Sequence, residues 1–339
     1  MNLSSHLRRL AFALWALAAV GVRGETRLLN ASFDISRELF QAYNPVFAAH
    51  WQAQTGETVT FSQSHAGSSK QARAVIDGLA ADVITFNQVT DVDQVAARGL
   101  VAKDWRTRFP HQSSPFTSTI VFLVRKGNPK AIRDWDDLAR PGVSVIVPNP
   151  KTSGNGRYSY LAAYAHALKQ NGGKAEAARE FVGRLFRNVP VLDTGGRGAT
   201  TTFVQREIGD VLLTFEAEVF LTLQELGRTV AGQPFEVVAP PYSVEAELPV
   251  ALVEKVVQRR GTTKQAQAYL EYLYSDAGQE VAAKNYFRPR SAAVARKFSG
   301  QFAQLTLFRV DDVFGSWAEA QKTHFAEDGV FDQIYRKTR

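Results

Sequence analysis

The chain contains no cysteine among its 339 residues. Disulfide bonds therefore cannot stabilise it, and stability must come from a buried core, which a composition of 45% hydrophobic and 22% charged residues can supply. A bacterial lipoprotein is attached through a cysteine at its cleavage site, so the absence also excludes a lipoprotein. Beyond the N-terminal region no run of about 18 apolar residues occurs, and we expect the mature chain not to span a membrane.

Motifs of several enzyme and nucleic-acid-binding classes are also missing. The chain has no GxxxxGKS/T phosphate loop, no GxSxG nucleophile elbow and no HExxH zinc motif. No cluster of Lys and Arg with interleaved aromatic residues occurs, so nucleic-acid binding is not expected. The sequence therefore predicts no cofactor, no metal site and no catalytic residue. One enzyme alternative stays open, because His65 lies near Ser64 and Ser68, the residue types of a Ser–His hydrolase.

Residues 1–24 have the pattern of a cleaved secretory signal. Arg8 and Arg9 form a basic start, residues 10–22 are apolar but short for a membrane span, and Gly24 is a small residue suited to cleavage. We expect cleavage after Gly24, and a short membrane anchor is the alternative. An exported chain that carries no lipid and stays near its cell indicates the periplasm.

The net charge is +7 for the whole chain. Removal of the signal takes away three arginines and no acidic residue, which leaves 37 Lys and Arg against 33 Asp and Glu, a net charge of +4. A mild positive charge favours anionic partners through long-range attraction. On its own, this charge indicates no more than a charged, soluble surface.

Strand-like and helix-like stretches alternate along the mature chain. The apolar runs 27–33, 58–63 and 81–86 are each followed by a polar loop and a helix-like segment, and Asp34 is expected to cap the first helix. This order predicts an α/β fold with largely parallel sheets, in which ligands bind beyond the carboxyl ends of strands. Further strands are expected at 118–129, 144–150, 189–194, 210–216, 235–241 and 248–254, with mostly helix from about Lys264.

Four polar loops fall at such strand ends. Each offers hydroxyls and backbone N–H groups before a helix, and a helix N-terminus is a ready anion site. Ordinary helix capping explains any one of them, but four together without a catalytic partner favour a receptor for an oxyanion. Arg157 and Arg197 lie in these loops and either neutralise the anion from behind its direct contacts or pair with buried acids. The loops are SFD (32–34), SHAGSSK (64–70), NPKTSGNGR (149–157) and DTGGRGATTT (193–202).

Several longer stretches are similar to one protein family. With them, the chain resembles the periplasmic sulfate- and thiosulfate-binding proteins of ABC importers over almost the whole mature length, and it looks closest to the thiosulfate-binding subtype. The resemblance implies a bilobed α/β fold of the type II binding proteins, with lobe 1 at 25–116 plus 247–339 and lobe 2 at 117–246. It also implies a monomer that delivers its ligand to the inner-membrane permease. The stretches include SFDISRELF, SHAGSSKQA, ADVITFNQVTDV, VPNPKTSGNGRYSYLAA, DTGGRGATTTF and GDVLLTFEAE.

The resemblance further implies how the ligand is held. The family binds its dianion almost wholly through backbone N–H groups and neutral side-chain donors. A donor-only site suits a fully ionised dianion, whereas phosphate at neutral pH keeps a proton whose buried O–H would lack an acceptor. Matched motif by motif, the contacts fall at the backbone of Asp34 and at Ser68 in lobe 1, and at Ser153, Gly154, Asn155 and Gly196 in lobe 2.

Phe215 departs from the strict sulfate binders, which have Trp at the matching position. Trp donates a hydrogen bond through Nε1–H and Phe has no donor, so sulfate should bind less tightly. Thiosulfate replaces one oxygen by a larger, softer sulfur, which an aromatic ring tolerates. Phe215 is therefore a hypothesis for thiosulfate acceptance, and the alternative is that it merely packs the cleft.

We thus expect a receptor for thiosulfate and/or sulfate that serves sulfur assimilation. A receptor for another tetrahedral oxyanion, such as molybdate, is an alternative from the same class. An exported hydrolase that uses Ser68 and His65 is an alternative from a different class.

Overall fold

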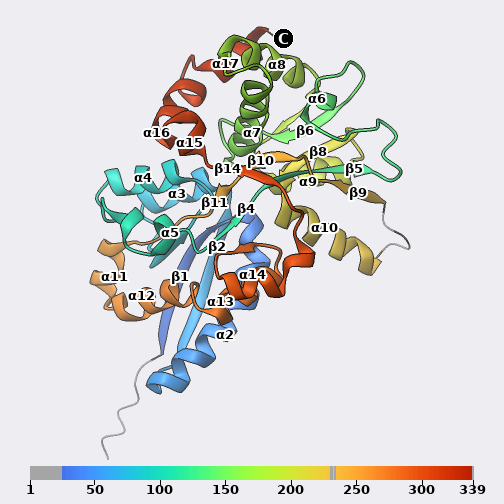
Figure 1. Cartoon of the computed structure of the whole chain (residues 1–339). Helices are drawn as coiled ribbons and strands as arrows, with labels where there is room; N and C mark the ends of the chain where they lie inside the picture. The colour runs from blue at the N-terminus through green and yellow to red at the C-terminus, as the bar shows by residue number, and fades with distance from the viewer. Residues whose placement is uncertain (1–24, 230–231, 233, 338–339) are drawn as a thin grey trace, which may run out of the picture.

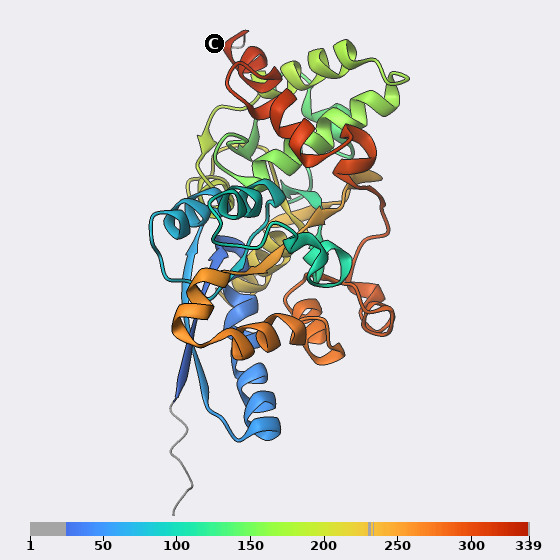
Figure 2. The ribbon, with the colours of Figure 1, turned by 90° about the vertical axis from the view of Figure 1, so that its left-hand side faces the viewer.

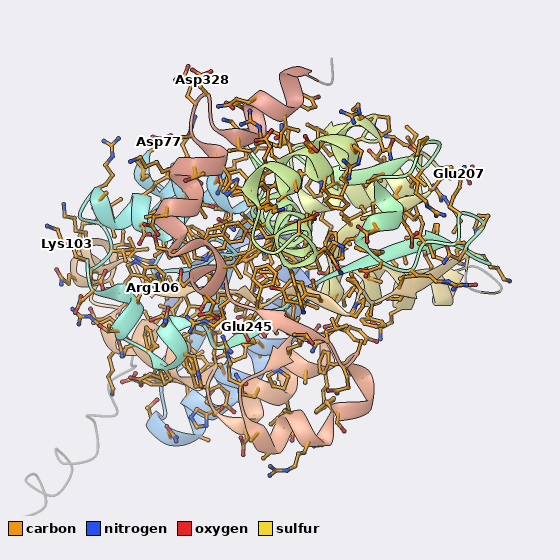
Figure 3. All side chains as sticks on the ribbon, turned by 45° about the horizontal axis from the view of Figure 1, so that its top comes forward. Asp77, Lys103, Arg106, Glu207, Glu245 and Asp328 are labelled. Atoms are coloured by element: carbon orange, nitrogen blue, oxygen red, sulfur yellow. The ribbon has the colours of Figure 1, made fainter. Side chains whose placement is uncertain are left out.

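The computed structural model describes residues 25–229, 232 and 234–337. The predicted signal, residues 1–24, lies outside the described residues. Within the described part, no helix combines the length and the apolar character needed to cross a membrane. Figure 1 shows two α/β halves, one above the other, with short strands between them. Charged side chains such as Lys103 and Glu207 are exposed and project from opposite sides of the molecule (Figure 3).

The half that lies lower in Figure 1, which we call lobe 1, is built on a four-stranded sheet in the order β12-β3-β1-β2. β1 is parallel to both β2 and β3, and β12 is antiparallel to β3. The loops that follow β1, β2 and β3 therefore share one edge of the sheet. The strands are β1 (Thr26–Phe33), β2 (Val59–Ala66), β3 (Val83–Thr85) and β12 (Val250–Leu252), and the helices are α2 (Arg37–Thr55), α3 (Ser68–Ile76), α4 (Val89–Ala97), α11 (Glu254–Arg260), α12 (Thr263–Tyr272) and α13 (Asp276–Lys284).

Aromatic rings join helix and sheet in the core of lobe 1. α2 buries Tyr43 and Phe47, one helical turn apart, and both contact Tyr269 of α12, with ring centroids 5.1 and 5.3 Å away. Phe61 of β2 lies 5.1 Å from the same ring. Such pairs stabilise a core beyond the area that they bury, which suits a chain without disulfides.

The upper half, which we call lobe 2, contains a five-stranded sheet in the order β7-β6-β8-β5-β9. β6 is parallel to β7 and β8, whereas β5 is antiparallel to β8 and β9. The strands are β5 (Ile120–Arg125), β6 (Val145–Pro148), β7 (Leu192–Asp193), β8 (Val211–Phe215) and β9 (Phe235–Val238), and the helices are α6 (Trp135–Leu138), α7 (Gly154–Gln170), α8 (Ala175–Arg187), α9 (Gly196–Val204) and α10 (Glu216–Thr229).

β5 is apolar along almost its whole length because side chains of helices pack on both faces of the sheet. Phe122 and Val124 belong to the large core cluster that includes the buried side of α7, while Val121 and Leu123 pack with Phe203 of α9. Successive side chains of a strand point to opposite faces, so a strand covered on both sides is apolar throughout.

The strand predicted at 118–129 is confirmed as β5 (Ile120–Arg125), but its first residue, Ser118, belongs to a different strand. β4 (Phe116–Ser118) pairs in a three-stranded sheet with β11 (Ala246–Glu247) and β13 (Arg288–Pro289), whereas β5 belongs to lobe 2. Thr119 separates the two strands, so the chain changes sheets within an unbroken β-forming run. The remaining elements are η1 (Asp34–Ser36), η2 (Trp105–Thr107), α5 (Pro110–Ser113), β10 (Tyr242–Val244), α14 (Ala292–Lys297), η3 (Ser299–Gln301), β14 (Thr306–Phe308), α15 (Val310–Phe314), α16 (Trp317–Ala320), η4 (Gln321–Phe325) and α17 (Val330–Lys337).

The last helices pack on lobe 2. Phe331 of α17 lies 5.2 Å, ring to ring, from Phe186 of α8, and Phe325 lies 5.2 Å from Tyr160 of α7. Figures 1 and 2 show α17 beside α8, at the end of the molecule opposite α2. The lobe limits given above stay a prediction. These contacts nevertheless attach η4 and α17, which the prediction assigned to lobe 1, to helices α7 and α8 of lobe 2.

Candidate anion-binding site

The loops predicted to bind an anion meet between the two lobes. Thr152 Oγ1 in the loop after β6 donates to the carbonyl of Thr194 in the loop after β7, at 3.1 Å. A Cβ atom added to Gly67, in the loop after β2, would lie 3.8 Å from the Thr152 carbonyl oxygen and 4.0 Å from that of Thr194. A Cβ atom added to Gly195 would likewise lie 3.2 Å from Oδ2 of Asp34. The strand-end loops of both sheets are thus in contact.

Ser68 is the first residue of α3 and is almost fully buried, at 1% exposure. Its Oγ has no hydrogen-bond partner within the part of the chain that the structure describes. Leaving a buried hydroxyl unpaired costs about 1–3 kcal/mol. The hydroxyl therefore lies ready for a partner at the point where α3 presents its unpaired N–H groups.

The start of α7 carries three of the predicted residues. Ser153 is the N-cap, and its Oγ accepts the Gly156 N–H at 3.4 Å, while Gly154 and Asn155 are the first two helical residues. The first N–H groups of a helix have no partner within it, so these two remain available. The Asn155 amide donates to Thr214 Oγ1 at 2.7 Å, which ties it to β8. Asn155 can therefore offer its backbone N–H, whereas one of the two N–H groups of its side-chain amide is already used.

Gly196 begins α9 beside the other loops. A Cβ atom there would lie 2.7 Å from Ile35 Cδ1 and 3.1 Å from Asn155 Nδ2. Because Gly196 has no side chain, the start of α9 lies close to the side chains of Ile35 in η1 and Asn155 in α7. The N-termini of α3, α7 and α9 therefore meet at one place.

Asp34 does not cap α2, contrary to the sequence prediction. It is the first residue of η1, and α2 begins at Arg37 without a side-chain cap. Its carboxylate instead accepts the N–H of Ile35 at 3.1 Å and the backbone N–H of Arg197. Burial raises the pKa of Asp34, against these hydrogen bonds and the nearby Arg197 charge, which lower it. Backbone donors thus already occupy the carboxylate.

Arg157 and Arg197 both pair with buried acids, which is one of the two roles left open by the sequence. Arg157 Nη1 lies 3.6 Å from Asp91, and its Nε donates to the Pro150 carbonyl at 3.1 Å. Arg197 Nε lies 3.2 Å from Glu218 of α10. Burial raises the pKa of Glu218 to about 7, opposed by the Arg197 charge and by the Thr200 hydroxyl that donates to it.

The same arginines connect the lobes. Arg197 Nη2 donates to Glu38 of α2 at 2.6 Å, and Asp91, the partner of Arg157, lies on α4. Both arginines belong to helices of lobe 2, whereas Glu38 and Asp91 belong to helices of lobe 1. The structure therefore has the two lobes in contact across the site.

Phe215 ends β8 and is fully buried. Its ring packs against Tyr158 of α7, with centroids 5.8 Å apart, and Tyr158 in turn contacts Trp317 at 5.0 Å. The neighbouring Thr214 holds the Asn155 amide, so β8 supports the start of α7 directly. The effect of Phe215 on ligand choice remains a prediction.

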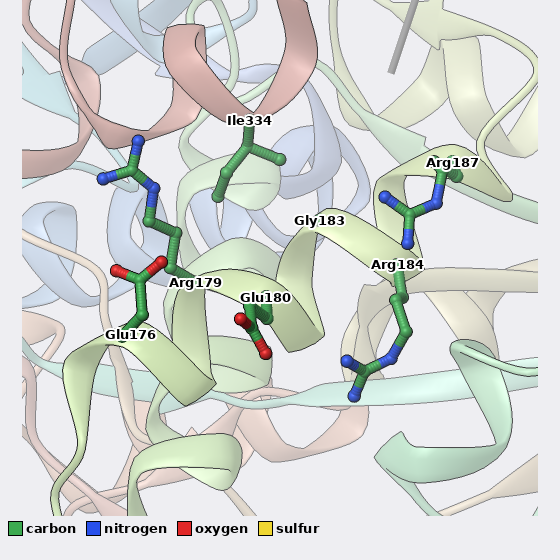
Figure 4. Close-up of a pocket in the computed structure, with 7 residues that line it drawn as sticks. All are labelled: Glu176, Arg179, Glu180, Gly183, Arg184, Arg187 and Ile334. Carbon is green, nitrogen blue, oxygen red and sulfur yellow. The ribbon is translucent and has the colours of Figure 1, made fainter. Parts of the chain in front are cut away.

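A cavity of about 550 Å³ opens beside these loops. Its lining includes Asp34, Gly67, Thr152 and Gly195, together with the exposed cations Lys70 and Arg73 of α3. A different cavity, of about 270 Å³, lies on the flank of α8 (Figure 4), where acidic and basic side chains alternate; it is lined by Glu176, Arg179, Glu180, Gly183, Arg184, Arg187 and Ile334. Only the first cavity adjoins the meeting point of the helix N-termini.

His65 is not paired with Ser68. Its Nδ1 hydrogen-bonds to Ser32 and its Nε2 to Gln63. Burial, together with the charges of Arg37 and Arg197, lowers the pKa of His65 to about 4. A Ser–His nucleophile needs the two side chains within hydrogen-bond reach, so this arrangement does not support the hydrolase alternative.

Sequence reasoning missed Asn87 and Gln88, which follow β3. Both side chains are buried, and Asn87 Oδ1 and Gln88 Nε2 have no hydrogen-bond partner among the described residues. They lie against Gly154, where a Cβ atom would come within 2.2 Å of Asn87 Oδ1. The strand-end rule that identified the other loops also applies to the loop after 81–86 and could have found this pair.

The comparisons with known proteins agree with this arrangement. A family model of bacterial extracellular solute-binding proteins matches residues 34–288. A thiosulfate-binding protein of Pseudomonas aeruginosa is 59% identical over 91% of this chain and 92% of its own, and a sulfate-binding protein of Escherichia coli is 53% identical over 95% and 97%. The solved sulfate-binding protein SubI from Mycobacterium tuberculosis has a TM-score of 0.79 at 33% identity, covering 88% of this chain and 99% of that one.

These similarities confirm the family resemblance and the bilobed α/β fold that it implied. The relatives are binding proteins and not enzymes. With matches over most of its length both in sequence and in structure, the chain belongs to the bacterial extracellular solute-binding proteins.

Proposed function

We propose that the chain is a periplasmic receptor that captures thiosulfate and sulfate and delivers them to the permease of an ABC importer. The observation that carries this proposal is the meeting of three helix N-termini around Ser68, whose buried hydroxyl has no partner among the described residues. Helix N-termini stabilise anions through unpaired N–H groups and the helix dipole. The relatives named for thiosulfate and sulfate support this choice of anion.

The anion would be held from both lobes. Lobe 1 supplies the backbone N–H of Asp34 and the hydroxyl and N–H of Ser68, and lobe 2 supplies donors from α7 and α9. Binding by both sides favours the closed arrangement over an open one, which is the usual hinge response of a two-lobed receptor. The lobe 2 contacts are Ser153, Gly154, Asn155 and Gly196.

We base the selectivity of the site on the N–H and O–H donors that it presents to a ligand. Among the described residues that line the adjoining cavity, Asp34 is the one carboxylate, and its oxygens already accept the N–H groups of Ile35 and Arg197. A ligand O–H would therefore have to share the Asp34 carboxylate with two backbone N–H groups. Sulfate and thiosulfate carry no proton at neutral pH, whereas phosphate does, and a buried unpaired O–H is costly.

Phe215 would bias this site towards thiosulfate. The ring is buried and offers no hydrogen bond, and it packs on Tyr158 of the helix that begins at Gly154. A position without a donor weakens binding little when it faces sulfur, because sulfur accepts hydrogen bonds weakly. The same position weakens binding more when it faces an oxygen of sulfate.

Export and transport complete the proposal. Cleavage of residues 1–24 would release a mature receptor without a lipid anchor, and we expect it to act as a monomer. The basic residues Lys70 and Arg73 at the cavity would attract a dianion to it. Isothermal titration with thiosulfate, sulfate, molybdate and phosphate tests the proposal, which fails if neither sulfur oxyanion binds. Preference for molybdate would favour the alternative receptor.

A further inference from the structure

Gln88 lies at the same sheet edge as the predicted contacts of lobe 1. β2 and β3 flank β1, so the loops that carry Ser68, Asp34 and Gln88 lie next to one another. Gln88 is the N-cap of α4, but its side chain makes no capping hydrogen bond. The side chain is 0% exposed, so whatever pairs with its amide must do so inside the protein.

The orientation of the Gln88 amide is fixed by Arg157. Gln88 Oε1 accepts from Arg157 Nη1 and from Thr90 Oγ1, both at 3.4 Å. A guanidinium has donors only. If the amide were flipped, the donor Nε2 of Gln88 would face the donor Nη1 of Arg157, which is unfavourable. Nε2 therefore points away from Arg157, and it has no hydrogen-bond partner within the described part of the chain.

The Gln88 side chain reaches across to the start of α7. A Cβ atom on Gly154 would lie 2.5 Å from Gln88 Cγ, so the side chain packs on the bare backbone of the first helical residue. The N–H groups of Gly154 and Asn155 are the donors that α7 presents to an anion. A buried N–H donor without a partner, beside a place where other unpaired donors meet, has an anion as its natural acceptor.

We propose that Gln88 Nε2 donates a hydrogen bond to the bound anion and adds a neutral donor from lobe 1. This inference rests on the proposed function and deepens it, because it names a further binding residue of the same site. Since Arg157 of lobe 2 holds the other end of the amide, closure of the lobes orients the Gln88 donor. Gln88 thus acts only in the closed arrangement, and its loss should raise the rate of anion release.

Titration calorimetry of three variants with thiosulfate and with sulfate tests the proposal. Gln88→Met keeps the size of the side chain and removes the donor, and we expect both anions to bind about ten- to a hundredfold less tightly. Gln88→Glu keeps acceptors for Arg157 but replaces the donor by a negative charge, so it should weaken binding more than Gln88→Met. Thr90→Val removes the other contact of Oε1 and keeps Nε2, so affinity should stay within about threefold of wild type.

The outcomes separate this inference from the proposed function. If the wild-type chain binds and a folded Gln88→Met variant, with an unchanged melting temperature in the absence of ligand, binds equally well, water satisfies the amide and the inference is overturned. If Gln88→Met fails to fold, Gln88→Glu decides, and wild-type affinity of that variant overturns the inference. Failure of the wild-type chain to bind either anion would overturn the proposed function itself.

Discussion

Gly154 at the start of α7 lies directly against Asn87 in the loop after β3, so that a Cβ atom on Gly154 would be 2.2 Å from Asn87 Oδ1. The contact joins lobe 2 to lobe 1. Gly154→Ala should therefore hinder closure rather than folding, and we expect affinity for thiosulfate to fall about ten- to a hundredfold, because overpacking costs about 1–3 kcal/mol. Calorimetric titration measures the affinity, and thermal unfolding without ligand should show little change.

Gly156→Ala is the matched control. Its Cβ atom would lie 2.3 Å from the Pro148 carbonyl oxygen, a clash within lobe 2 that no movement of the lobes relieves. We expect that variant to melt at a lower temperature without ligand. Equal affinities of Gly154→Ala and wild type would show that binding does not need the lobes as close as they lie in this structure.

Ser68→Ala separates binding from folding at a single hydroxyl. Because Ser68 Oγ is buried without a partner among the residues that the structure describes, its removal should leave the melting temperature of the unliganded protein unchanged or higher. Loss of a hydrogen bond to a charged ligand, about 1.5–3 kcal/mol, should weaken binding of either anion about ten- to a hundredfold. Ser69→Ala is the control, since Ser69 Oγ donates to Asp91 at 2.9 Å and should affect stability more than affinity. A Ser68→Ala variant with lower stability and wild-type affinity would contradict the role of this donor.

Glu218 should make stability depend on pH. Burial raises its pKa from 4.5 to about 7 in the folded protein, so between these pH values the folded state holds the proton that the unfolded state has lost. The free energy of unfolding therefore falls as pH rises through this window and levels off above it. Relative to Glu218→Gln, which cannot titrate, wild type should lose about 2–3 kcal/mol between pH 5 and pH 8. Urea unfolding measures both curves, and parallel curves would refute the prediction.

Phe215→Trp tests the hypothesis for ligand choice. An indole N–H directed at the anion should favour sulfate, raising the ratio of sulfate to thiosulfate affinity about tenfold or more. Phe215 is fully buried against Tyr158, so the larger ring can lower both affinities, and the ratio is the quantity to measure. Phe215→Leu, which has no donor either, should leave the ratio as it is in wild type. If a folded Phe215→Trp variant keeps the wild-type ratio of sulfate to thiosulfate affinity, Phe215 only packs the cleft and does not set ligand choice.

The meeting of the polar loops could be predicted from the sequence because it follows from a general rule. Parallel strands end at one edge, so loops rich in Ser, Thr and Gly after such strands come together there. The same rule covers the loop after β3, but Asn87 and Gln88 were missed because a pair of amides lacks the Ser and Gly pattern. In the structure they are identified by their contact with Gly154 and by Asn87 Oδ1 and Gln88 Nε2, which have no hydrogen-bond partner among the described residues.

Other features depend on contacts far apart in sequence. Arg197 reaches Glu38 across the lobes, and nothing near either residue predicts the pair. Asp34 looked like a helix cap, but its carboxylate is held by the Arg197 N–H of α9 and α2 starts later. The position of α17 on lobe 2 depends on Phe331 and Phe186, which local pattern cannot connect. Tertiary contacts of this kind override local signals.

We infer that the site accepts a dianion because it presents N–H and O–H donors, and because Asp34, the one carboxylate among the described residues that line its cavity, already accepts two backbone N–H groups. Thermal unfolding of the mature chain with thiosulfate, sulfate or phosphate tests this claim most directly, because a ligand that binds the folded state raises the melting temperature. We predict a higher melting temperature with micromolar thiosulfate or sulfate and an unchanged one with millimolar phosphate. Equal stabilisation by phosphate would contradict it.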